Sequence, residues 1–153
     1  MLYVDTSALV KLYVRETLSK EIADFLKRRN QPMPLTRFHE LEFSNALQLK
    51  CHRAELAEAE TEDILSRFKS HEEIGIYFRP PIEWSIVFDF AVNLSTRHTK
   101  TIGARSLDIF HVASALAIEA DHFLTLDERQ AQLAHSAGIK VREIARTLLF
   151  DPT

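Results

Sequence analysis

Four carboxylates stand beside apolar segments, in positions from which they could act together: Asp5, Glu42, Asp108 and Asp127. Asp5 and Asp127 each follow a short apolar run, and Glu42 and Asp108 lie in segments with a helical pattern. Hard cations such as Mg²⁺ and Mn²⁺ prefer carboxylate oxygens as ligands. Two such ions about 4 Å apart activate a water molecule and stabilise the leaving oxygen of a phosphodiester. The four acids are therefore candidate metal ligands and candidate catalytic residues.

Glu42 is the acid that helical geometry marks out most clearly. At about 100° per residue it lies between Phe38, Ala46 and Leu49, on the apolar face of the helix expected around it. A carboxylate in such a stripe is costly unless it is protonated, paired or bound to a cation. The neighbouring Glu40 points about 160° away and is expected at the surface. A buried ion pair with an arginine remains an alternative for Glu42.

Each of the other three acids also has a purely structural explanation. Asp5 follows a strand, where turns and helix caps are common. Asp108 lies in the first turn of an apolar helix, where the helix dipole stabilises a negative charge by ~0.3–1 kcal/mol. Asp127 begins the run Asp-Glu-Arg-Gln, which resembles a capping box with Gln130 at the reciprocal position. Capping and metal binding are compatible, because a carboxylate has several lone pairs.

Hydroxyl, imidazole and guanidinium groups near the acids are candidate supporting residues. Ser7 and Thr125 place hydroxyls where they can orient a ligand carboxylate or a metal-bound water. His111 follows the third acid by three residues; a packed or hydrogen-bonded histidine is the commoner case there, because no zinc-type ligand set accompanies it. Arg105 lies in the one locally basic stretch, which can grip a phosphate or form a solvated face. Arg129 can likewise reach a phosphate or pair with the acid beside it.

The elements that must position these residues alternate between strands and helices. Strands are expected at 2–4, 76–78, 122–126 and 139–141, with a brief one near 31–36, and helices at 7–13, 18–28, 37–53, 56–71, 84–97, 107–119 and 127–137. Thr36 and Ser106 are expected to cap the helices that follow them, and Gly138 to end the last. This alternation predicts an α/β sandwich with a mostly parallel sheet. Ligands of such sheets bind beyond the carboxyl ends of the strands, where Asp5 and Asp127 lie.

Length, charge and cysteine content narrow the class of protein. The 153 residues fit one domain, expected over 1–150, whose core needs no disulfide or structural metal. The net charge of −3 argues against a general nucleic-acid-coating protein but not against a nuclease, because bound cations offset carboxylate charge. The single cysteine, Cys51, excludes an intrachain disulfide and suits a reducing compartment. No signal peptide or membrane-spanning segment is evident, so a cytoplasmic protein is expected.

Four stretches of the sequence resemble, in order, the motifs of PIN-domain proteins, and most closely those of the VapC-type toxins of toxin–antitoxin pairs. They are LYVDTSALVKLYVRE, HELEFSNALQLK, RSLDIFHVASAL and FLTLDERQAQLA. The resemblance extends to about residue 142, and the order and spacing of the four motifs are more specific than any one of them. The family's four acids fall on Asp5, Glu42, Asp108 and Asp127, and the hydroxyl after its first acid falls on Ser7.

This resemblance implies a three-layer α/β/α sandwich with a mostly parallel central sheet. It also implies an endoribonuclease that hydrolyses RNA phosphodiesters with Mg²⁺ or Mn²⁺ as cofactor, forms homodimers and is inhibited by a cognate antitoxin. That antitoxin would lay an apolar segment over the groove and place a basic side chain at the acids. These expectations follow from the resemblance and not from composition or periodicity.

Three other interpretations remain open at this point. A housekeeping PIN nuclease of RNA maturation would use the same chemistry, and a short upstream reading frame for a DNA-binding antitoxin would separate a toxin from it. A non-catalytic binding module with the same fold is disfavoured, because all four acids are present. A metal-dependent phosphatase with Asp5 as nucleophile is disfavoured, because DTSAL lacks a second Asp two residues on.

Overall fold

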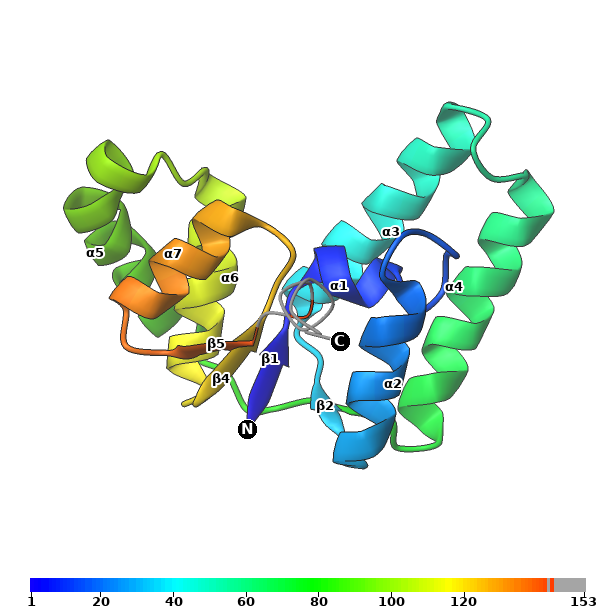
Figure 1. Cartoon of the computed structure of the whole chain (residues 1–153), viewed down its shortest axis with the longest axis horizontal. Helices are drawn as coiled ribbons and strands as arrows, with labels where there is room; N and C mark the ends of the chain where they lie inside the picture. Colours follow the sequence, from blue (N-terminus) through cyan, green and yellow to red (C-terminus); the bar gives the residue numbers. More distant parts are fainter. Residues whose placement is uncertain (143, 145–153) are drawn as a thin grey trace, which may run out of the picture.

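The computed structural model describes residues 1–142 and residue 144, and it alternates strands and helices along the chain (Figure 1). In chain order the elements are β1 (Leu2–Val4), α1 (Thr6–Val10), α2 (Ser19–Arg29), β2 (Met33–Pro34), α3 (Arg37–His52), α4 (Glu58–Glu73), β3 (Tyr77–Phe78), α5 (Trp84–Ile102), α6 (Ser106–Ala117), β4 (His122–Leu124), α7 (Glu128–Ser136) and β5 (Lys140–Arg142). The predicted alternation is confirmed. The end of the domain predicted over 1–150 lies outside the described residues.

Every strand pair in the described part of the chain is parallel. β4 lies between β1 and β5, with Tyr3 opposite Phe123 and Phe123 opposite Val141. β2 and β3 form a separate two-stranded pair, and β2 contacts the free side of β1. The parallel arrangement brings the carboxyl ends of β1 and β4 to the same edge, as the alternation of elements predicts.

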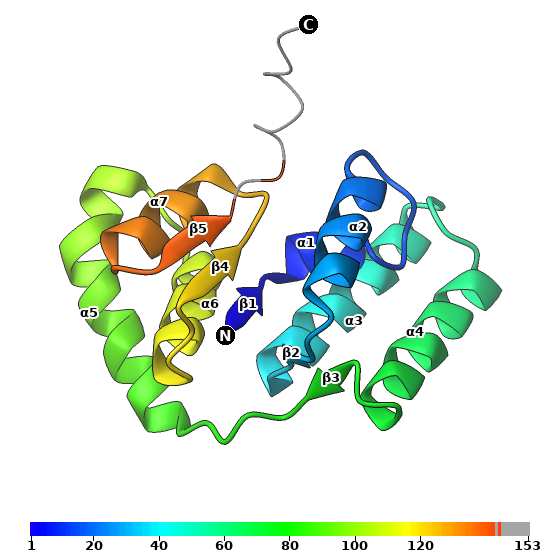
Figure 2. The same ribbon diagram turned by 60° about the horizontal axis from the view of Figure 1, so that its bottom comes forward.

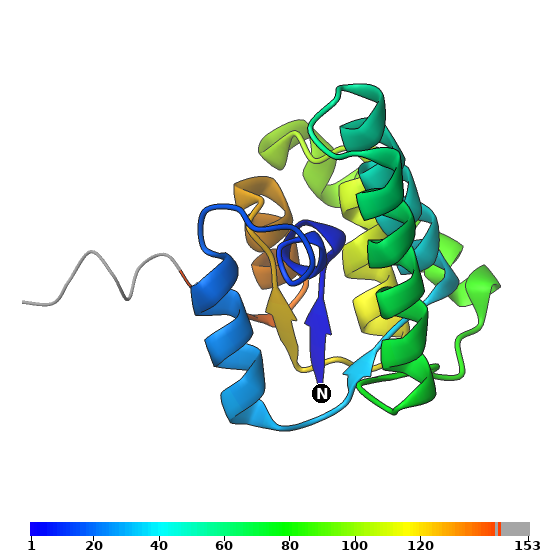
Figure 3. The same ribbon diagram turned by 90° about the vertical axis from the view of Figure 1, so that its right-hand side faces the viewer.

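The central strands carry apolar side chains on both faces, because helices cover both. Tyr3 and Phe123 stack at a ring distance of 5.3 Å and join the core beneath α5, α6 and α7. Leu2, Val4 and Leu124 point to the other face and pack against α2. Figure 3 shows α2 on one side of β1 and β4 and α4 and α6 on the other. The expected three-layer α/β/α sandwich is present.

The α3–α4 pair has its own apolar core, which joins it to α1. Phe43 stacks on Phe68 at a ring distance of 4.2 Å, and Tyr13 meets both rings edge to face. Leu9 and Val10 of α1 belong to the same cluster. In Figure 2 this pair lies to one side of the sheet, opposite α5 and α7. The packing ties the segment after β1 to α3, and these two elements form part of the site described below.

Some predicted boundaries are wrong, for local reasons. Helix α5 continues to Ile102, five residues beyond its expected end, and stops at Gly103, whose φ of 71° is a left-handed conformation that glycine tolerates best. Ser106 does not cap α6: it is the first helical residue, and Arg105 stands at the cap position. Strand β4 ends at Leu124, two residues earlier than expected, so Thr125 belongs to the turn that leads into α7.

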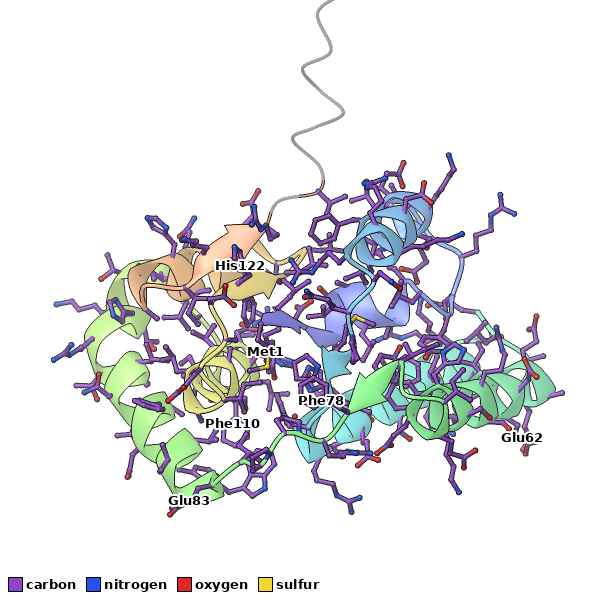
Figure 4. The ribbon with its side chains drawn as sticks, turned by 90° about the horizontal axis from the view of Figure 1, so that it is seen from below. Met1, Glu62, Phe78, Glu83, Phe110 and His122 are labelled. Atoms are coloured by element: carbon purple, nitrogen blue, oxygen red, sulfur yellow. The ribbon has the colours of Figure 1, made fainter. Side chains whose placement is uncertain are left out.

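The amino ends of the strands form the opposite edge of the molecule, which Figure 4 shows from below with Met1 and His122 side by side. There the terminal ammonium of Met1 pairs with Asp121. No helix in the described part of the chain is long and apolar enough to cross a membrane.

Candidate active site

A cleft of about 770 Å³ opens at the carboxyl ends of β1 and β4. Its walls come from α1 and the segment after it, from one face of α3, and from the starts of α6 and α7. All four predicted acids line it: Asp5, Glu42, Asp108 and Asp127. Residues as far apart as 5 and 127 thus meet in one place, as expected for strand ends of a parallel sheet.

Asp5 is completely buried and held by hydroxyl groups from both neighbouring strand ends. The Ser7 hydroxyl donates to its two carboxylate oxygens at 2.8 and 2.9 Å, and the Thr125 hydroxyl donates to Oδ2 at 2.9 Å. The backbone N–H of Ala8 donates to Oδ1 at 3.0 Å, which makes Asp5 the cap of α1. Ser7 and Thr125 therefore orient this carboxylate directly, in agreement with their predicted supporting role.

Burial is the largest influence on the ionisation of Asp5, and it raises the pKa of this carboxyl above its ordinary value. A positive charge on His111, which exists only when that ring is protonated, and the hydrogen bonds from Ala8, Ser7 and Thr125 lower this pKa, but by less than burial raises it. No salt bridge to Asp5 occurs among the described residues. A buried acid without a salt bridge is the condition in which a bound cation would stabilise the ionised form.

Glu42 pairs with a histidine rather than with an arginine. Its Oε2 accepts hydrogen bonds from the Thr6 hydroxyl at 2.9 Å and from Nε2 of His111. The carboxylate is about one-fifth exposed, and Leu49, which helped to define its apolar face, is 40% exposed. The face is less buried than a continuous apolar stripe suggests, because it forms a wall of the cleft, and the carboxylate is paired, as one of the expected alternatives required. Glu40 does point away, toward Arg37 and Arg79 at the surface, as predicted.

His111 connects Glu42 to the centre of the sheet. Its ring is 1% exposed, and Nδ1 lies 2.9 Å from the Tyr3 hydroxyl on β1. Burial raises the pKa of Tyr3 well above its ordinary value, so this hydroxyl keeps its proton. Since a carboxylate only accepts, the ring donates to Glu42 through Nε2 and, when neutral, accepts from Tyr3 through Nδ1. The hydrogen-bonded histidine expected from the sequence is thus confirmed, and its partner is one of the four acids.

Asp108 is held at the first turn of α6 by two neighbours. Its Oδ2 accepts the backbone N–H of Arg105 at 2.9 Å, and its Oδ1 accepts the side-chain amide of Gln130 at 3.2 Å. The sequence required a partner for an acid entering so apolar a helix, and these two groups supply it. The other amide atom of Gln130, Oε1, is buried and accepts no hydrogen bond from the described residues.

Asp127 caps α7, which makes its structural role more explicit than that of the other acids. Its Oδ1 accepts the backbone N–H groups of Arg129 at 2.8 Å and Gln130 at 3.0 Å. The reciprocal half of the predicted capping box is absent, because the Gln130 side chain turns to Asp108. The Thr125 hydroxyl accepts the backbone N–H of Asp127 instead, at 3.0 Å. Thr125 therefore contacts both Asp5 and Asp127.

The two arginines proposed from the sequence do not line this cleft. Arg105 is exposed at the start of α6, and the guanidinium of Arg129 donates to the carbonyl of Gly103 at 3.4 Å rather than to Asp127. The lining instead includes Lys11 and Lys50, which sequence reasoning missed. Lys11 lies six residues after the first acid, within the first resemblance motif, which was the only signal that could have indicated it.

The donor set of the cleft suits a hard cation, since its acids offer carboxylate oxygens. Glu42 Oε1 and Asp127 Oδ2 accept no hydrogen bond from the described part of the chain, and carboxylate oxygens that already accept one can still bind a cation. No three His, Cys, Asp or Glu side chains within residues 1–142 and 144 are close enough together to form a ready-made metal shell. The acids share a cleft but are held separately, so their roles as metal ligands stay predictions.

Comparison with known proteins supports the fold. No family model and no curated protein matches the sequence. Among solved structures, FitAcB from Neisseria gonorrhoeae superposes with a TM-score of 0.65 at 14% sequence identity, over 95% of this chain and 99% of the matched chain. At this identity the match concerns architecture alone: over nearly its whole length, the chain has the same PIN-like α/β fold.

Proposed function

We propose that this chain is a metal-dependent endoribonuclease, the toxin of a toxin–antitoxin pair of the VapC type. The observation that carries the proposal is the meeting of Asp5, Glu42, Asp108 and Asp127 in one cleft at the carboxyl edge of a parallel sheet. The PIN-like fold and the order of the four sequence motifs support the same reading. Mg²⁺ or Mn²⁺ is the proposed cofactor, and RNA the proposed substrate.

The chain's own residues prepare the cleft for this chemistry. The hydroxyls of Ser7 and Thr125 hold the Asp5 carboxylate, and Thr6 and His111 hold Glu42, so that neither has to be oriented when a ligand arrives. Mg²⁺ or Mn²⁺ bound by these acids would supply an activated water and stabilise the leaving oxygen of the phosphodiester. No covalent nucleophile is required, and Ser7 is committed to Asp5.

The direct test is cleavage of labelled RNA by the full chain with Mn²⁺ or Mg²⁺, compared with EDTA. Asp5→Asn and Asp108→Asn should each lower the cleavage rate at least 100-fold at matched metal, while circular dichroism shows a retained fold. Lys140→Gln, an exposed change on β5, is the control. Wild-type cleavage by either asparagine variant, or cleavage that survives EDTA, would refute the assignment of these acids.

The toxin role needs a separate measurement, since a housekeeping nuclease would pass the cleavage test. Induced expression should arrest growth, and co-expression of the neighbouring gene should restore it. Arrest should disappear with Asp5→Asn. If the active nuclease leaves growth unchanged, the role in RNA maturation replaces the toxin. The proposed homodimer and the antitoxin complex are checked by light scattering of the chain alone and of the co-purified pair.

A further inference from the structure

The positive charges of the cleft are few and lie on one side of it. Among the described lining residues, Lys11 and Lys50 are the only lysines, and no arginine is present. The same lining contains five acids: Asp5, Glu16, Glu42, Asp108 and Asp127. A polyanionic strand that reaches these acids is repelled by them, and bound cations offset that repulsion only where they sit. Phosphates farther along the strand need positive groups of the protein.

Glu16 holds the two lysines together at this wall. The Lys11 ammonium donates to its Oε2 at 2.7 Å, and the Lys50 ammonium pairs with its Oε1. Lys50 also contacts Glu55 at 3.2 Å. The lysine side chains are only 17% and 21% exposed, so their stems lie against the protein while the ammonium groups reach the cleft. An ammonium has three N–H donors, which leaves two on Lys11 and one on Lys50 for a further acceptor.

The position of Lys50 relative to the acids indicates the direction in which a bound RNA strand would run along α3. Glu42 and Lys50 are eight residues apart on α3, with Asn45, Ala46 and Leu49 between them on the same lining face. That spacing places Lys50 about 12 Å along the helix axis from Glu42. In Figure 1, α3 leads from the sheet past α1 toward the far end of the α3–α4 pair. The cleft thus has four of its acids at the sheet, and the two lysines with Glu16 between them along its outer wall.

We propose that Lys11 and Lys50 form a phosphate-binding site for the RNA strand that flanks the cleaved bond, with Glu16 as the residue that positions both. This inference rests on the proposed function, because it assigns the substrate-binding side of the same cleft. The RNA strand would then bind along α3 and along residues 11–16, which follow α1, and away from Arg105 and Arg129. A competing explanation is that the three side chains only brace that segment against α3.

The test measures binding of fluorescently labelled single-stranded RNA by anisotropy in EDTA, where no cleavage is expected, over a series of salt concentrations. Lys11→Gln and Lys50→Gln should each weaken binding to a similar degree for RNAs of different sequence. Each should also reduce the slope of log affinity against log salt by about 0.7, the value for one phosphate contact to a single strand. The arginine variants at both positions should keep the wild-type slope.

Three controls carry the same loss of charge: Arg105→Gln, Arg129→Gln and Lys140→Gln. They should leave the slope unchanged. Urea unfolding of each variant separates lost binding from lost stability, and methionine replaces glutamine wherever a variant fails to fold. Wild-type slopes in both lysine variants, or slopes reduced equally by the controls, would overturn the proposal. The proposal would also fail if the lysine variants bound RNA normally but no longer bound the protein encoded by the neighbouring gene. The lysines would then contact a protein partner.

The outcome is separable from that of the proposed function. If the chain binds RNA through the lysines but does not cleave it, the binding site stands and the nuclease fails. If Mn²⁺-dependent cleavage is present while the lysine variants bind as the parent does, the nuclease stands and this site fails.

Discussion

The ends of β1 and β4 are neighbours in one parallel sheet, and each is followed by an aspartate that caps a helix. At β1, Asp5 comes directly after the strand and is fully buried. At β4, Asp127 comes three residues after the strand and is partly exposed. Asp5 accepts hydrogen bonds from the hydroxyls of Ser7 and Thr125 in addition to its capping bond. Among the described residues, Asp127 accepts only the two backbone N–H groups of its helix.

The local structure alone accounts for one of these two acids and not for the other. A helix cap requires one or two backbone bonds, and Asp127 has them, so its capping role accounts for its presence. A cap of the five-residue helix α1 does not require two further hydroxyls or complete burial of a carboxylate. Burial of an acid without a cationic partner costs free energy, as the raised pKa of Asp5 indicates. Asp5 therefore carries the stronger physical argument for a ligand.

Apart from removal of Asp5 itself, removal of the Ser7 and Thr125 hydroxyls should have the largest effect on cleavage. We expect Ser7→Ala combined with Thr125→Val to raise the Mn²⁺ concentration for half-maximal cleavage roughly 10- to 100-fold, because the Asp5 carboxylate loses the groups that orient it. Ser106→Ala and Thr101→Val, both exposed, are matched controls. An unchanged Mn²⁺ requirement, with the fold intact by circular dichroism, would mean that these hydroxyls serve only local structure.

A buried histidine distinguishes the β1 end in a second way. His39 donates through Nε2 to the carbonyl of Val4 at 2.9 Å, and its Nδ1 accepts the Thr36 N–H at 3.1 Å, so the ring is neutral. Burial lowers the pKa of His39 to about 3. A depressed histidine pKa contributes stability that is present above about pH 6.5, the unfolded value, and is lost as pH falls toward 3.

We therefore expect the free energy of unfolding to fall by about 1.4 kcal/mol per pH unit through this window on account of His39. Asp5 contributes with the opposite sign, because its raised pKa favours the folded state at low pH and loses that contribution as pH rises through the folded pKa. The contributions of His39 and Asp5 can be separated by urea unfolding between pH 7 and pH 4. The parent chain is compared with His39→Asn and with Asp5→Asn. Equal slopes for the parent and the His39 variant would contradict the assignment.

Loss of the Asp127 cap should have the smallest effect, a change in the free energy of unfolding that differs from the effect of changing Asp5. Asp127→Ala should lower the free energy of unfolding by about 1 kcal/mol in metal-free buffer, while Asp127→Asn should cost much less, because asparagine is also a good cap. Asp5→Asn should cost nothing at pH 7, since it removes a buried charge. Urea unfolding measures all three. A large loss in Asp127→Asn would show that its charge, not its cap, stabilises α7.

Much of the secondary structure could be predicted from the local pattern of apolar and polar residues. The apolar run 2–4 and the run from 122 specify the paired strands, and Thr36 caps α3 as expected, accepting the His39 N–H at 3.4 Å. The helical pattern separated Glu42 from Glu40 correctly. The boundaries of α5 and α6 were predicted wrongly, because helix propensity defines the end of a helix only loosely. The polar residues near the end of α5 do not interrupt it, and the helix stops at Gly103.

The local sequence pattern was sufficient to place two of the acids at strand ends and two near helix starts, because hydrophobic periodicity and chain order are local properties. The partners of these acids depend on the tertiary structure. His111 meets Glu42 across 69 residues, Gln130 leaves its expected cap for Asp108, and Lys11 and Lys50 replace the arginines at the cleft. These choices depend on the packing of α3 and α6 against the sheet, which places side chains distant in sequence within hydrogen-bonding reach and which no local pattern records.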